Sequence, residues 1–257
     1  MSDRKLIKKI CVLFALANLG VPNVVVFGAE EVLYKSTGKL EFIPGTDPTN
    51  PVDPENPDPT NPVKPIDPTD PQGPNPGTTG PLSIDYASSL DFGRNKITNK
   101  DKIYYANAQG FSDRLSGDFR GNYAQITDNR GTNGGWTLKL KQEEQFKSDT
   151  ATKYRELTGA EISLTEVIAA SKSNVSAFPT VNNVTLNPGY EVTIMRASKG
   201  NGSGTWVSRF GKAEKMTIDG EIVQKNKAVT LDVPGNTPKE AVTYVTKLIW
   251  TLTDTPV

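Results

Sequence analysis

Carboxylates are the side chains of this chain best suited to hydrolytic chemistry. Two carboxyl groups on either side of a glycosidic bond can cleave it, one as a general acid and the other as a base or nucleophile. Acidic residues are common in any chain, so their presence does not by itself indicate an enzyme. The residues available for such a pair are Asp85, Asp91, Glu143, Glu144 and Glu161.

Catalysis that depends on histidine or cysteine has almost no residues to draw on in this chain. The 257 residues contain no histidine and a single cysteine, Cys11. This composition excludes zinc sites of the Cys/His kind and nucleophiles activated by histidine. The glycine-rich stretch 200–204 lacks the lysine of a phosphate loop and leads into a strand-like sequence, so it predicts a flexible hairpin. We therefore expect no enzymatic activity, no metal and no cofactor.

The most specific pattern is the tripeptide Trp-Thr-Leu, which occurs at residues 136–138 and again at residues 250–252. In a strand, residues i and i+2 point to the same face, so each copy places a tryptophan beside a leucine. Such a pair either packs in the core or forms a contact surface for a ligand, and both interpretations stay open here. The candidate binding residues are Trp136, Leu138, Trp250 and Leu252.

The N-terminus has the pattern of a secretory signal peptide. A basic segment is followed by an apolar run at residues 10–16, and cleavage is expected after Ala29 or one residue earlier. Gly20 and Pro22 leave the apolar run too short to cross a membrane. Removal of residues 1–29 also removes Cys11, so the mature chain would fold without disulfides, which suggests a bacterial surface.

Charge and composition divide the rest of the chain. The formal net charge at neutral pH is zero, too mild for a nucleic-acid-binding protein, so we expect no nucleic-acid partner. Residues 44–80 contain twelve prolines and recurrent Asp-Pro pairs, which predict a disordered, solvated spacer. Extended chain would splay these aspartates apart and disfavour calcium binding. Residues 30–43 contain a short alternating segment, which predicts an outlying strand or, alternatively, a disordered end.

Residues 81–257 are enough for one well-buried domain, and their pattern is β throughout. Short alternating segments separated by Gly, Asn and Pro turns predict an all-β, sandwich-like domain. Residues 136–140 form the clearest half-buried strand, and residues 164–170 are the only stretch with helical character. The last predicted strand, residues 241–252, has apolar side chains on both faces, which is typical of a central, doubly covered strand.

Around the two Trp-Thr-Leu copies, the chain resembles the WxL-domain surface proteins of low-GC Gram-positive bacteria, as a small member without added domains. The resemblance rests on the signal peptide, the Asp-Pro tract and the flanks of both motifs. These flanks include Leu90-Asp91-Phe92-Gly93, Asp128-Asn129-Arg130-Gly131 and Gly135-Trp136-Thr137-Leu138. A single Trp-x-Leu would carry no weight, but two copies with these flanks are specific.

The resemblance implies a secreted protein attached non-covalently to the Gram-positive cell wall through peptidoglycan. The mild basic excess of residues 81–257 is compatible with weak attraction to an anionic wall. The resemblance also implies membrane-anchored surface proteins that interact with the WxL domain. An alternative therefore remains, in which the chain is a structural subunit that binds such a partner and contacts the wall only indirectly.

Overall fold

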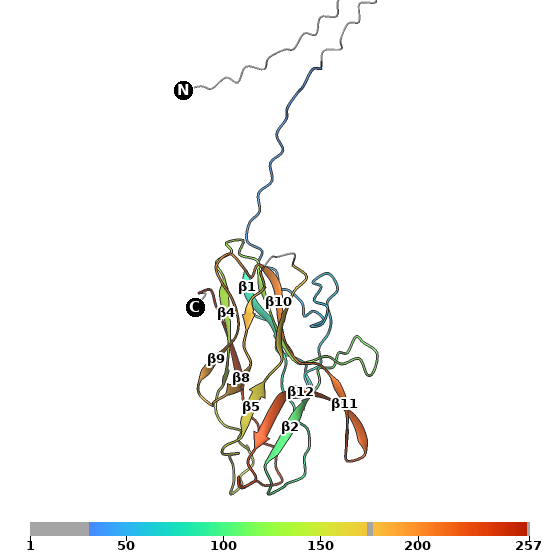
Figure 1. Cartoon of the computed structure of the whole chain (residues 1–257), viewed down its shortest axis with the longest axis vertical. Helices are drawn as coiled ribbons and strands as arrows, with labels where there is room; N and C mark the ends of the chain where they lie inside the picture. The colour runs from blue at the N-terminus through green and yellow to red at the C-terminus, as the bar shows by residue number, and fades with distance from the viewer. Residues whose placement is uncertain (1–30, 174–176, 256–257) are drawn as a thin grey trace, which may run out of the picture. The chain divides into compact units, whose positions relative to one another are not determined.

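The computed structural model of the chain describes residues 31–173 and 177–255 (Figure 1). Within these ranges the chain forms thirteen β-strands in three antiparallel sheets and no α-helix, which confirms the predicted all-β class. The chain divides into two units, residues 1–41 and 42–257, which are described separately. The predicted signal peptide, residues 1–29, lies outside the described residues.

The first sheet has the strand order β1-β3-β10-β6. Its central strand β3 is buried along its whole length, because both faces of the sheet are covered. One face carries Ala124 and Ile126 into the main core, while the other carries Tyr123 toward a second, smaller cluster. The bounds are Leu82–Ala87 for β1, Tyr123–Asp128 for β3, Gly204–Phe210 for β10 and Val167–Ala170 for β6.

The second sheet is organised around the long strand β12. It has the order β11-β12-β5-β8, and β2 also pairs with β12. Asp219 and Gly220 both have positive φ at the turn between β11 and β12, as a two-residue hairpin requires. The bounds are Glu214–Ile218 for β11, Glu221–Val233 for β12, Glu161–Leu164 for β5, Val184–Leu186 for β8 and Lys102–Asn107 for β2.

The third sheet has the order β13-β4-β9-β7 and contains both Trp-Thr-Leu copies. Its strands contribute to the main core together with strands of the first and second sheets. Phe210 of β10 and Trp250 of β13 stack with ring centroids 6.4 Å apart, so the first and third sheets face each other (Figure 1). The bounds are Leu248–Thr253 for β13, Trp136–Gln142 for β4, Glu191–Ala197 for β9 and Thr180–Val181 for β7.

Residues 44–80 differ from the expected solvated spacer. This segment, hereafter the Pro/Asp tract, packs on the outer face of the first sheet. Val52 and Val63 are buried against Tyr86 and Tyr123, and the amide of Val52 donates a hydrogen bond to Oε1 of Gln125 at 2.7 Å. Two isolated valines thus give a proline-rich chain enough apolar burial to offset part of the entropy of ordering it.

The recurrent aspartates of the Pro/Asp tract shape its turns. Asp53, Asp58, Asp67 and Asp70 each accept a hydrogen bond through Oδ1 from the backbone amide two residues further on, at 2.7 to 3.0 Å. In each case proline stands between the two residues, so the Asp-Pro-x unit forms an Asx turn with one φ already set by the proline ring. The repeat therefore encodes a folded path and not an extended rod.

Three other expectations differ from the structure. Residues 31–43 form no strand, and Leu40 and Phe42 are exposed, because alternation alone does not supply a hydrogen-bonding neighbour. The stretch with helical character contains the strand β6, which starts after Glu166 at φ 50°. Residues 200–204 are not a hairpin loop, since they connect β9 of the third sheet with β10 of the first.

Candidate functional site

The two Trp-Thr-Leu copies lie on neighbouring strands. β4 and β13 pair antiparallel, with Leu138 opposite Leu252 and Leu140 opposite Trp250. Residues opposite each other across strands share a face, so Leu138, Leu140, Trp250 and Leu252 all belong to the face that turns toward the core. Although far apart in the sequence, the two motifs form one continuous apolar strip.

Trp136 and Leu138 are completely buried. The indole Nε1 of Trp136 donates a hydrogen bond to the carbonyl oxygen of Gly202 at 2.9 Å, which satisfies the polar atom of this side chain. Just before it, Gly135 has φ +79°, and a Cβ there would lie 2.5 Å from the carbonyl oxygen of Ala197. The first motif is therefore a core element, and these two side chains cannot reach a ligand in this fold.

Trp250 and Leu252 are half-buried, because their strand lies at the end of the third sheet. This corrects the expectation of a central, doubly covered strand: β13 begins only at Leu248 and pairs with β4 alone. Residues 241–247 do not continue it, apart from a single bridge between Val245 and Lys147. Leu248, Trp250 and Leu252 pack against the main core from this strand, but all six residues of β13 stay partly exposed.

The acidic side chains considered for catalysis lie on different elements with different partners. Asp85, on β1, is buried under the Pro/Asp tract and accepts hydrogen bonds from Ser83, Gln125 and Thr127. Glu143 and Glu144 follow β4 and lie close to lysine side chains. Asp91 accepts a hydrogen bond from the side chain of Asn107. Glu161 is an exposed residue of β5. Among the described residues, no group of three or more side chains is placed to hold a metal ion.

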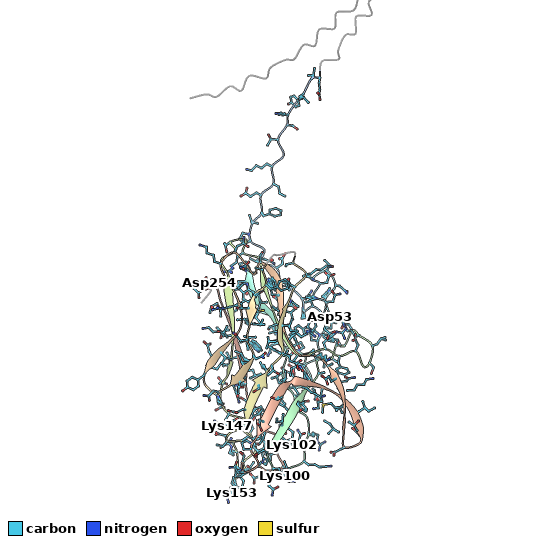
Figure 2. All side chains as sticks on the ribbon, in the orientation of Figure 1. Asp53, Lys100, Lys102, Lys147, Lys153 and Asp254 are labelled. Carbon is cyan, nitrogen blue, oxygen red and sulfur yellow. The ribbon has the colours of Figure 1, made fainter. Side chains whose placement is uncertain are left out.

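A groove of about 520 Å³ opens where three segments meet. The Pro/Asp tract supplies one wall with Ile66 and Pro68, the segment after β2 supplies a second, and the start of β12 supplies the third. Asp53 marks the side of the unit where the tract lies (Figure 2). The groove-lining residues are Ile66, Pro68, Ser89, Asn107, Ala108, Gln109, Gly110, Ser116, Gly117, Phe119, Asn122, Ile222, Val223 and Gln224.

Gln109 holds the tract wall of the groove in place. Its Nε2 donates to the carbonyl oxygens of Ile66 and Gly110 at 2.9 and 2.8 Å. Its Oε1 accepts from the hydroxyls of Tyr86 and Ser88, so every hydrogen-bonding group of this buried amide is used. Without the docked Pro/Asp tract the groove would lose the wall that Ile66 and Pro68 form.

An ion-pair cluster fixes the tract from a second direction. Arg114 lies 2.8 Å and Arg120 3.1 Å from the carboxylate of Asp53. Burial alone would raise the pKa of Asp53, but hydrogen bonds from the Glu55 amide and the two guanidinium groups outweigh it and lower the pKa. Asp53 is therefore a charged anchor of the tract at neutral pH.

The groove is chemically neutral, because no groove-lining residue is ionisable. It combines amide and hydroxyl groups with an apolar surface from Phe119, Ile222 and Val223. Such a site suits an uncharged ligand with amide or hydroxyl groups and some apolar surface, and it provides no acid or base for hydrolysis. The prediction from sequence missed these residues. The signal that could have found them is the isolated aliphatic residues of the Pro/Asp tract, which a solvated spacer does not need.

The fold places this chain among the β-sandwich proteins. Its sequence matches the model of a family described as WxL domain, surface cell wall-binding, over residues 29–256. The match spans nearly the whole chain, including the Pro/Asp tract, and the protein belongs to the WxL-domain family. It is accordingly a surface protein of the cell-wall-binding kind. No curated protein and no solved structure matches it. Within the described residues, no helix is long and apolar enough to cross a membrane.

Proposed function

We propose that this protein is secreted and attaches non-covalently to the Gram-positive cell wall by binding peptidoglycan in the groove beside the Pro/Asp tract. The family supports attachment to the wall in general. The neutral, amide-rich lining of the groove supports peptidoglycan in particular, and it is the observation that carries the proposal. The protein acts by binding alone, without catalysis.

The chemistry of peptidoglycan fits this lining. Its glycan strands present hydroxyl and acetamido groups, and its stem peptides present backbone amides, all of which pair with amide and hydroxyl side chains. Sugar rings and methyl groups pack on apolar surface such as Phe119 and Ile222. A groove that is open on one side also accepts a segment of a polymer, whereas a closed cavity would admit only a small molecule.

Sedimentation with purified, protein-free peptidoglycan tests the proposal. The chain from residue 30 onward should pellet with the wall polymer at near-physiological salt. Ile222 lines the groove and is 74% exposed. The variant Ile222→Ser should bind peptidoglycan about tenfold more weakly, which corresponds to about 1.4 kcal/mol of binding free energy. Ile218→Ser is the matched control, because Ile218 lies on the same hairpin but does not line the groove.

Two results would contradict the proposal. If the unmodified chain stays in the supernatant, it does not bind peptidoglycan directly. If Ile218→Ser weakens sedimentation as much as Ile222→Ser does, binding does not take place in the groove. Circular dichroism and thermal melting of both variants ensure that the comparison is between folded proteins.

A different observation favours a second candidate function, in which the chain binds a membrane-anchored surface protein. β13 ends the order of the third sheet, and all six of its residues are partly exposed. An edge strand offers backbone N–H and C=O groups to a strand of another chain. Pelleting with walls that retain their proteins, but not with protein-free peptidoglycan, would support this candidate and rule out the first.

A further inference from the structure

Lys225 is a buried lysine without a carboxylate in direct contact among the described residues. It lies on β12, is 6% exposed, and its Nζ donates a hydrogen bond of 3.4 Å to the carbonyl oxygen of Phe92. Burial lowers the pKa of Lys225, and the charge of Asp91 opposes this shift only in part. A larger fraction of this side chain is therefore the neutral, nucleophilic amine than for an exposed lysine.

The residue opposite Lys225 on the neighbouring strand is Asn107 of β2. The backbone amide of Asn107 points away from β12 and donates to the carbonyl oxygen of Asp91 at 2.7 Å. The pair is therefore of the non-hydrogen-bonded kind, in which the two side chains lie closest. Because residues 91–93 lie on the far side of β2, the Lys225 side chain must cross Asn107 to reach Phe92.

The carboxamide of Asn107 is held beside an acid. Its Nδ2 donates to Oδ2 of Asp91 at 2.7 Å, and Oδ1 of Asp91 is fixed by the amide of Gly93 at 2.8 Å. Gly93 also leaves the space that the lysine occupies, since a Cβ there would lie 3.3 Å from Nζ of Lys225. An amine, a carboxamide and a carboxyl group thus meet at one edge of β2.

We propose that Lys225 and Asn107 form an intramolecular isopeptide bond that links β12 to β2, with Asp91 as the proton-transferring group. The inference concerns covalent structure and does not depend on the peptidoglycan proposal. It assigns a self-modification to three side chains, of which only Asn107 also lines the groove and none belongs to the Trp-Thr-Leu motifs.

The reaction needs no oxidant, no reductant and no other reactant. The neutral Nζ of Lys225 attacks Cγ of Asn107, and the Nζ–Cγ bond forms as the carbonyl becomes tetrahedral. The carboxylate of Asp91 takes a proton from the attacking nitrogen and passes it to Nδ2 of Asn107. The Cγ–Nδ2 bond then breaks, ammonia leaves, and a secondary amide remains between the two side chains.

Intact-mass measurement of the purified chain is the direct test. The expected result is a mass lower than the sequence mass by one ammonia, together with a branched tryptic peptide that joins the segments around residues 107 and 225. Lys225→Met keeps an unbranched, apolar side chain without the amine and should restore the full mass. In Asp91→Asn most molecules should keep the full mass and stay uncross-linked, because the amide cannot transfer the proton.

The test also separates a competing reaction. Asn133 precedes Gly134, and a succinimide at this pair would lose ammonia as well. A mass deficit that persists in Lys225→Met, without the branched peptide, would overturn the proposal. So would a full mass in the unmodified chain, with Lys225 open to amine labelling after denaturation. Both readouts are independent of how stable the variants are.

Discussion

The indole nitrogen of Trp136 and the carbonyl oxygen of Gly202 are joined by a hydrogen bond of 2.9 Å. This bond connects the start of β4 to the glycine-rich loop between β9 and β10. The loop approaches so closely that a Cβ on Gly202 would lie 2.5 Å from Nε1 of Trp136 and 2.3 Å from the Cβ of Ala197. The first motif tryptophan thus requires glycine at this point of the loop.

Gly202→Ala should destabilise the protein by about 3 kcal/mol or more, because overpacking adds to the cost of positive φ. Gly200→Ala is the matched control: Gly200 also has positive φ, +92°, but nothing lies within 4 Å of its Cβ position. It should cost only about 1–2 kcal/mol. Urea unfolding measures both, and equal losses would show that close packing on Trp136 is unimportant.

The two motif tryptophans should differ in their contribution to stability. Trp136→Ala removes a fully buried side chain and should cost about 3–5 kcal/mol of unfolding free energy. Trp250→Ala removes a half-buried side chain stacked on Phe210 and should cost about 2 kcal/mol. Thermal melting gives the order, and a larger loss at Trp250 would contradict the assignment of Trp136 to the core.

The Pro/Asp tract should detach when its apolar anchors are removed. Val63→Ser places a hydroxyl in the cluster with Tyr123 and Phe111, and Asn61→Ser changes an exposed neighbour as a control. The amides of Val63 and Ile66 donate to Pro51 and Gly110, so their hydrogen exchange reports docking. We expect faster exchange in Val63→Ser alone. Fast exchange in the unmodified chain would mean that the tract is not docked.

Asp85 should make stability decrease with rising pH on the acidic side. Burial raises the pKa of Asp85 above its ordinary value of 3.8, and hydrogen bonds from Thr127, Ser83 and Gln125 offset this only in part. The folded state then holds the proton more tightly than the unfolded chain does. Stability is therefore lost as pH rises from 3.8 through the folded pKa.

Asp85→Asn should remove this decrease, as measured by urea unfolding at a series of pH values. Asp47→Asn, a change at an exposed tract residue, should leave the decrease in place. Asp53 acts in the opposite direction: its pKa is lowered, so its contribution is lost as pH falls through the folded pKa. If Asp85→Asn keeps the full decrease, another buried group causes it.

Much of the sheet structure could be predicted from alternation and turn residues. The strand predicted at residues 136–140 corresponds to β4, because one of its faces carries large apolar side chains into the core. The hairpin of β11 and β12 was missed. None of residues 214–224 is buried, so no core-facing apolar side distinguishes these strands in the sequence, and only the Asp219-Gly220 turn indicates the hairpin.

The candidate site could not be predicted, because its walls come from segments that are far apart in the chain. Ile66, Phe119 and Ile222 converge only when the Pro/Asp tract docks on the first sheet. The proline-rich composition predicts that such a tract stays solvated, although two local features of its sequence indicate a folded, docked segment. One was the Asp-Pro-x unit, which forms Asx turns, and the other was the pair of isolated valines Val52 and Val63.

The edge position of β13 has a consequence for the timing of folding. β4 needs β9 on one side and β13 on the other, and β13 is the last strand of the described chain to become available. Until residues 248–253 have been synthesised, the backbone of β4 is an unpaired edge beside the apolar side chains of Leu138 and Leu140, and a second chain can add a strand there. Nascent or truncated chains should therefore aggregate, and completion of the third sheet should be a late, long-range step.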